Sequence, residues 1–248
     1  MWIACSALPL RPARKWASVL PRILLPCCGV LLAEKETVNI MFAAAPSQSD
    51  ALEALLAEPD IDWSRVNAFH MDEYIGLDPN APQGFGNFLR RAMFGRKPFA
   101  TVNYIDPAAA DPQAEADRYQ QLLLNSPMDL CVLGVGENGH VAFNDPAVAD
   151  FEDPRLVKTV ALDDVCRNQQ VNDGCFAKLD DVPKAAMTVT VPGLMRAKAL
   201  FCIVPAKTKA AAIARLLNGE INEECPATIL RLQPAAKLYL DADSASLL

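Results

Sequence analysis

After residue 35 the sequence alternates short apolar runs with longer segments of helical periodicity, and this alternation restricts the possible folds more than any other feature. Parallel strands need long crossover connections, usually helices, so we expect a mostly parallel sheet with helices on both faces. The expected strands are residues 38–43, 66–70, 102–105, 130–135, 187–191, 199–204 and 237–240. The expected helices are residues 47–57, with Ser47 as the N-cap, 111–124 and 207–217.

The length of 248 residues is compatible with one large domain, and no repeat or linker divides the chain. We therefore expect residues 38–248 to form a single doubly wound α/β domain. Residues 1–37 stand apart, because basic residues there precede an apolar stretch that Pro21 and Pro26 interrupt. This N-terminal segment is predicted to be a first amphipathic helix, with an atypical leader or an incorrectly chosen start codon as the alternatives.

Charge and cysteine usage exclude several classes of protein. The net charge of -7 repels a phosphate backbone and an anionic membrane, so neither nucleic acid nor a membrane is an expected partner. An anionic substrate would then need a local positive pocket. The eight cysteines form no C-x-x-C pair, which argues against a zinc site or a disulfide framework. Several lie in apolar runs, as Cys131 and Cys202 do, which indicates free thiols in a reducing compartment and a cytoplasmic protein.

Polar segments follow three of the expected strands: A-A-A-P-S-Q-S, H-M-D-E-Y and G-V-G-E-N-G-H-V-A-F-N-D-P. Ligands of doubly wound sheets bind at the carboxyl ends of the strands, so these segments are expected to border one pocket. The chain has two histidines, His70 and His140, and both fall in these segments. Each could be an acid/base catalyst or a hydrogen-bonded structural imidazole, and the sequence leaves both open.

Two adjacent carboxylates, Asp72 and Glu73, follow the second strand. Strand geometry sends neighbouring side chains to opposite faces, so only one is expected to face the pocket, as a general base, while a helix cap or a surface charge is the alternative role. Glycines at 134, 136 and 139 let the backbone approach a ligand closely. They do not form the G-x-G-x-x-G fingerprint, so no dinucleotide cofactor is expected.

Three motifs, F-H-M-D-E-Y-I-G-L, G-V-G-E-N-G-H-V-A-F-N-D-P and V-P-K-A-A-M-T-V-T-V-P, resemble those of the glucosamine-6-phosphate deaminase (isomerase) family, whose superfamily also contains 6-phosphogluconolactonase. The resemblance covers residues 38–248, and D-E-Y-I-G-L and H-V-A-F-N are more similar to the deaminases. It implies a modified Rossmann fold and conversion of glucosamine 6-phosphate to fructose 6-phosphate and ammonia, without a metal or another cofactor. The expected partner is thus a small sugar phosphate, and a homo-oligomer is left open.

The resemblance also implies roles for individual residues. Asp72 matches the base that moves a proton from C2 to C1 of the sugar. His140 matches the residue that assists opening of the sugar ring, and Asp145 matches the carboxylate that supports it. Lys209 matches a lysine that contacts the substrate phosphate.

The chain departs from the family at several positions. Asn138 stands where the deaminases carry an aspartate, and an amide can orient an imidazole without supporting its positive charge. The phosphate loop lacks glycine, although we expect the turn at Ser47 and Gln48 to offer helix amides to an anion. A family arginine is missing near Gly174. These changes concern the substrate's phosphate more than the proton chemistry.

Two other functions stay open on the sequence. A hydrolase of the 6-phosphogluconolactonase kind would use the same histidine to activate water against a lactone. A non-catalytic sugar-phosphate-binding protein is the second alternative, because related folds serve as effector-binding domains.

Overall fold

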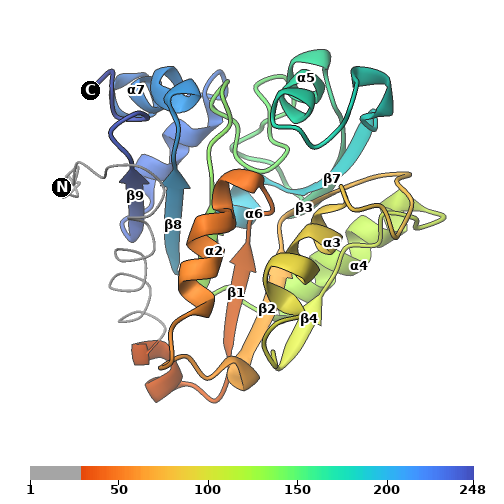
Figure 1. Cartoon of the computed structure of the whole chain (residues 1–248), viewed down its shortest axis with the longest axis vertical. Coiled ribbons are helices and arrows are strands. Elements are labelled where there is room, and N and C mark those ends of the chain that lie inside the picture. Colours follow the sequence, from red (N-terminus) through yellow and green to blue (C-terminus); the bar gives the residue numbers. More distant parts are fainter. Residues whose placement is uncertain (1–28) are drawn as a thin grey trace.

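The computed structural model describes residues 29–248 and contains a six-stranded sheet in the order β4-β2-β1-β5-β8-β9 (Figure 1). Its strands are β1 (Val38–Phe42), β2 (Val66–His70), β4 (Thr101–Asn103), β5 (Leu130–Leu133), β8 (Ala199–Val204) and β9 (Ala236–Leu240). Every neighbouring pair is parallel, and the strand order reverses between β1 and β5. The predicted doubly wound α/β fold is therefore confirmed.

A second, antiparallel sheet of three strands lies beside the first, in the order β3-β7-β6. It consists of β3 (Asp72–Tyr74), β6 (Val157–Ala161) and β7 (Ala185–Val189). Residues 187–191 were predicted as a strand of the parallel sheet. This prediction is wrong, because the strand there, β7, belongs to the antiparallel sheet. β3 begins two residues after β2 ends, leaves the parallel sheet and pairs with β7. The sequence did not predict this strand, because β3 has no apolar run of its own.

The predicted helices are present with adjusted ends: α2 (Ser49–Leu56), α4 (Pro112–Asn125) and α7 (Ala210–Asn218). Asp111 caps α4, and its carboxylate accepts the amides of Gln113 and Ala114. The prediction of Ser47 as an N-cap is wrong, because Pro46 opens a 3-10 turn, η2 (Pro46–Gln48), before α2 begins, and neither start has a side-chain cap. A similar turn, η6 (Lys207–Lys209), precedes α7.

The sequence pattern did not mark the other helices and helical turns. They are α3 (Phe85–Leu89), α5 (Asp164–Asn172), α6 (Val191–Met195), the π-helical turn η4 (Arg90–Phe94) and the 3-10 turns η3 (Trp63–Arg65), η5 (Leu179–Asp181) and η7 (Pro226–Leu232). Most of them are too short to show a helical period, and α5 is strongly polar.

Helices cover both faces of the parallel sheet, so β5 is buried along its whole length. Along β1, Ile40 and Phe42 point into one apolar cluster, which includes Leu52 of α2. Met41 points into the other cluster, which includes Tyr119 of α4. Each large side chain contributes about 1.5 to 3 kcal/mol on burial, and this packing holds the carboxyl ends of the strands in fixed positions.

Residues 29–34 are helical, and the contact of Lys35 with the fully buried Asp129 connects this end of the chain to the start of β5. The remainder of the predicted N-terminal segment, residues 1–28, lies outside the described residues. Among residues 29–248, no helix is both long enough and apolar enough to cross a lipid bilayer.

Candidate active site

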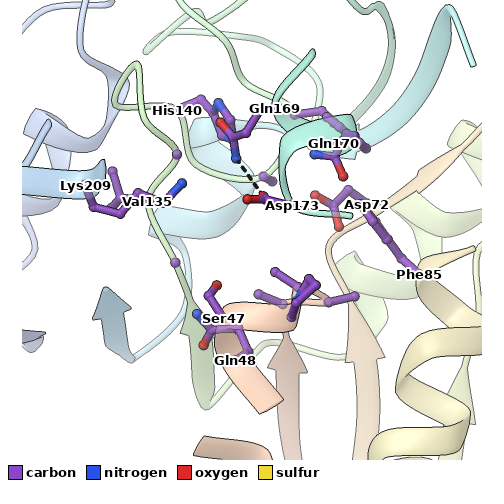
Figure 2. Close-up of a pocket in the computed structure, with 18 of the residues that line it drawn as sticks. Ser47, Gln48, Asp72, Phe85, Val135, His140, Gln169, Gln170, Asp173 and Lys209 are labelled. Atoms are coloured by element: carbon purple, nitrogen blue, oxygen red, sulfur yellow. Dashed lines mark hydrogen bonds between the residues drawn. The ribbon is translucent and has the colours of Figure 1, made fainter. Parts of the chain in front are cut away.

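A cavity of about 190 Å³ lies at the carboxyl end of the parallel sheet, where the strand order reverses (Figure 2). The loops after β1, β5 and β8 contribute residues 43–48, 134–136 and the group Pro205, Ala206, Thr208 and Lys209. Asp72, His140 and residues of α5 and its C-cap also line the cavity, together with Met71, Phe85, Ala142 and Phe143. The expectation that three strand-end segments border one pocket is confirmed.

The two adjacent carboxylates separate as strand alternation predicts. Asp72 lines the cavity, whereas Glu73 is directed away from it and accepts the backbone amides of Tyr74, Phe85 and Gly86. Burial, followed by repulsion from Glu73, raises the pKa of Asp72 well above its ordinary value. A carboxyl group with a raised pKa is a stronger base once it is ionised. This property suits Asp72 to removing a weakly acidic C–H proton.

We predict that Glu73→Gln mainly reduces stability. Oε1 accepts two amides and Oε2 accepts that of Gly86, so a glutamine would place its own N–H₂ against one backbone donor. The expected loss is about 1 to 2 kcal/mol in the free energy of unfolding, with a smaller change in rate per folded molecule. Urea unfolding would measure this loss, with the exposed Glu152→Gln as control. Unchanged stability would contradict the role of Glu73 as the acceptor of these three backbone amides.

The two histidines have different roles in the structure. His70 is fully buried, its Nε2 accepts the amide of Ile105, and its Nδ1 lies 2.9 Å from the carbonyl oxygen of Asp72. An acceptor at Nε2 places the ring proton on Nδ1, so the ring donates to Asp72. Burial lowers the pKa of His70 to about 4, although the hydrogen bond to the Asp72 carbonyl by itself raises this pKa. His70 is therefore a neutral structural imidazole that holds the backbone of Asp72.

His140 lines the cavity, and its Nδ1 lies 2.9 Å from Oδ1 of the buried Asp145. Asn138 does not line the cavity: its amide donates to Oδ1 of Asp145 over 2.8 Å and its oxygen accepts the backbone N–H of His140. Burial alone would raise the pKa of Asp145, but His140 and Asn138 outweigh burial and lower it. The carboxylate thus stays ionised beside the imidazole, and Asn138 orients Asp145 and the loop rather than the ring.

Gly136 forms the surface against which the imidazole of His140 packs. A Cβ atom added to Gly136 would lie 2.2 to 2.4 Å from three ring atoms of His140, so any side chain there must displace the ring. We predict that Gly136→Ala lowers turnover on the order of 100-fold, because catalysis tolerates little misplacement of a reacting group. Steady-state rates would measure this, with Gly29→Ala as control because its added Cβ meets no atom within 4 Å. A variant with full activity would show that the ring position is unimportant.

The predicted anion-binding residues differ in how available they are. Ser47 is exposed and lines the cavity. Gln48 is only 1% exposed and its Nε2 donates to the carbonyl oxygen of Ile203, so this donor is committed to the fold, whereas its Oε1 has no hydrogen-bond partner in the described part of the chain. Lys209 is 8% exposed, and its Nζ lies 3.7 Å from Oε1 of Glu137. Lys209 is the one lysine or arginine that lines the cavity among residues 29–248.

Helix α5 supplies cavity residues that the sequence reasoning missed. Gln169, Gln170 and Asp173 line the cavity from this helix and its C-cap, and Gln169 donates to Asp173 over 3.5 Å (dashed line in Figure 2). The polar run N-Q-Q-V-N-D was the available signal. It carried no prediction, because nothing in the sequence shows that this helix covers the end of another sheet.

Comparisons with known proteins agree with the motifs. Residues 14–239 match the model of a family described as "Glucosamine-6-phosphate isomerases/6-phosphogluconolactonase". Glucosamine-6-phosphate deaminase of Streptococcus sanguinis is 33% identical over 88% of this chain and 92% of its own length. The deaminase of Listeria monocytogenes serotype 4a is 33% identical over 85% of this chain and 88% of its own.

Solved structures show the same fold. A monomeric glucosamine-6-phosphate deaminase superposes with a TM-score of 0.86 at 26% identity, covering 96% of this chain and 98% of its own. The 6-phosphogluconolactonase of Trypanosoma brucei superposes with a TM-score of 0.76 at 15% identity, covering 96% of both chains. The second likeness concerns the fold alone.

Proposed function

This chain belongs to the family of glucosamine-6-phosphate isomerases and 6-phosphogluconolactonases, and we propose that it is an enzyme that converts glucosamine 6-phosphate to fructose 6-phosphate and ammonia. The observation that carries this proposal is the pair formed by Asp72 and His140, which line one cavity from two separate strand-end segments. One group supplies a base with a raised pKa, and the other supplies an imidazole backed by a carboxylate.

Asp72 is the proposed base. In the open-chain amino aldose, the C2 proton is weakly acidic because of the adjacent aldehyde. Asp72 removes this proton and returns it at C1, while one proton passes from the amino group to the C1 oxygen. C1 thereby becomes a hydroxymethyl group, and C2 carries a C=N double bond. Water adds to this imine and ammonia leaves, so the products are the ketose and ammonia. The carboxylate must be held within hydrogen-bonding reach of C2, which the anchoring of its backbone by His70 favours.

His140 is the proposed acid/base group for ring opening. Opening requires a proton at the ring oxygen and loss of one from the C1 hydroxyl, and an imidazole can give and take a proton in one cycle. Asp145 faces Nδ1, which leaves Nε2 as the nitrogen for the sugar. Asp145 and Asn138 are positioning residues in this scheme, because neither lines the cavity.

Lactone hydrolysis is the less favoured reaction. It needs an activated water and no base for a C–H proton, so it gives Asp72 no role. We place the enzyme in the cytoplasm, where sugar phosphates and reduced cysteines are found, and the five described cysteines, Cys131, Cys166, Cys175, Cys202 and Cys225, are free. Assembly of identical copies stays a prediction.

The test is incubation of the purified chain with glucosamine 6-phosphate, with ammonia and fructose 6-phosphate both measured. We expect both products in equal amounts, and no hydrolysis of 6-phosphogluconolactone above the uncatalysed rate. Hydrolysis of the lactone without ammonia release would support the lactonase alternative. Binding of the sugar phosphate without either product would support the non-catalytic alternative.

A further inference from the structure

The third sequence motif, V-P-K-A-A-M-T-V-T-V-P, contains the whole of β7, yet none of its residues lines the cavity. Its contacts nevertheless reach the segment that carries Asp72. Thr188 lies opposite Asp72 in the antiparallel register of β7 and β3. The amide of Val189 donates to the carbonyl oxygen of Met71 over 2.7 Å. Backbone pairing with β7 therefore fixes the place of Asp72.

The same two residues of β7 also hold the turn that begins with the cavity histidine, residues 140–145, which we call the histidine turn. The backbone amide of Phe143 donates to Oγ1 of Thr188 over 3.1 Å. The side-chain amide of Asn144 donates to the carbonyl oxygen of Val189 over 2.9 Å. The hydroxyl proton of Thr188 goes to that carbonyl over 3.1 Å, so lone pairs of its oxygen are free to accept the amide. Because Thr188 is fully buried, no solvent can replace a lost partner.

The backbone of the histidine turn depends on such anchors. Ala142 lines the cavity with a φ of +50°, in the left-handed region that favours glycine. Such a conformation persists where surrounding contacts impose it. The two anchored residues, Phe143 and Asn144, directly follow Ala142, and Asp145 comes next. A displaced turn would therefore disturb the contact between Asp145 and His140.

We propose that Thr188 is a positioning residue, whose hydroxyl holds the histidine turn in place relative to Asp72 and thereby supports opening of the sugar ring. The inference rests on the proposed function for the reaction, and it adds a role for a residue outside the cavity. The backbone of β7, and not this hydroxyl, holds Asp72. Loss of the hydroxyl should therefore affect ring opening and spare proton transfer at C2.

The experiment compares the parent with Thr188→Val and Thr188→Ser. Valine keeps the shape of threonine but deprives the amide of Phe143 of its acceptor. We expect Thr188→Val to lower the rate on closed-ring glucosamine 6-phosphate on the order of tenfold, and the rate on an open-chain analogue by less than about twofold. Thr188→Ser keeps the oxygen and should restore the rate. If the valine variant does not fold, Thr188→Cys offers a poor acceptor of similar size for the same comparison.

Thr190 provides the matched control, because it is an equally buried threonine of the same motif. Its hydroxyl donates to the carbonyl oxygen of Arg155 and accepts the amide of Gly193, and neither partner belongs to the histidine turn. Thr190→Val should reduce stability towards urea without changing the ratio of the closed-ring to the open-chain rate.

A second measurement does not depend on activity. The chain has two histidines, so NMR of the untagged protein shows two sets of imidazole C–H signals, which His140→Gln assigns. Thr188→Val should move the signal of His140 and leave that of His70 in place, because the contacts of His70 do not involve Thr188. In Thr188→Ser both signals should stay at the parent's positions.

Three results would overturn the inference: an unmoved His140 signal in Thr188→Val, equal loss of rate with closed and open substrate, or the same change of this ratio in Thr190→Val. Ammonia release by Thr188→Val at the parent's rate would refute this inference alone. A parent that releases no ammonia, with the His140 signal still dependent on the Thr188 hydroxyl, would refute the proposed function and leave the placement of the turn by Thr188 intact.

Discussion

Asp72→Asn is expected to lower the turnover of glucosamine 6-phosphate by a factor on the order of 100 to 10,000. The substitution removes the carboxylate at nearly constant shape, so the cavity and the anchoring of the backbone by His70 persist. The direct measurement is exchange of the C2 proton with deuterated solvent. Exchange at the parent's rate in Asp72→Asn would show that another group is the base.

The same variant should be more stable than the parent at neutral pH. Burial, followed by repulsion from Glu73, raises the pKa of Asp72 in the folded state. A carboxyl with a higher pKa when folded holds its proton more tightly in that state, so stability is lost as pH rises from the ordinary range near 3.9 through the folded-state pKa. Asparagine has no proton to lose. Thermal unfolding from about pH 3 to pH 8 should show that the Tm of Asp72→Asn exceeds that of the parent by an amount that grows with pH. A Tm difference that does not change with pH would contradict the raised pKa of Asp72.

The raised pKa also affects the rate. A base acts only when deprotonated, so the acid limb of kcat/KM should lie above the ordinary carboxylate range.

His140→Gln is expected to lower the rate on closed-ring substrate on the order of 100-fold while sparing an analogue supplied in open-chain form. The reason is the separation of roles: His140 comes from the loop after β5 and Asp72 from the start of β3, so one can be lost without moving the other. Pre-steady-state rates on the two forms of substrate provide the measurement.

Two outcomes would contradict this role for His140. Equal loss with closed and open forms would place the histidine in the proton transfer or in binding. A lower Tm with little change in rate per folded molecule would make it a structural imidazole like His70. The contact of His140 with Asp145 is compatible with a catalytic and with a structural role. Only a difference in rate between closed-ring and open-chain substrate distinguishes the two roles.

The sequence was sufficient for the parallel sheet because apolar runs report burial on both faces. β2 and β8 occupy the predicted residues 66–70 and 199–204, and the other parallel strands lie within two residues of their predicted ends. Local patterns could not identify the partner of residues 187–191. Apolar residues such as Met187 and Val189 fit the parallel or the antiparallel sheet equally well. Pairing with β3, a three-residue strand of mostly polar character, decides which sheet they join.

The sequence by itself determined which residues could carry proton chemistry: only two histidines exist, and strand alternation separated Asp72 from Glu73. Tertiary structure alone decided which histidine is available, because His70 is enclosed by the sheet and bonded at both nitrogens while His140 faces the cavity. It alone also brought Lys209 of η6 and Asp173, the C-cap of α5, into the lining of one cavity. Alternation and helical period act over a few residues, whereas the environment of a charge depends on groups that the chain brings together from distant positions.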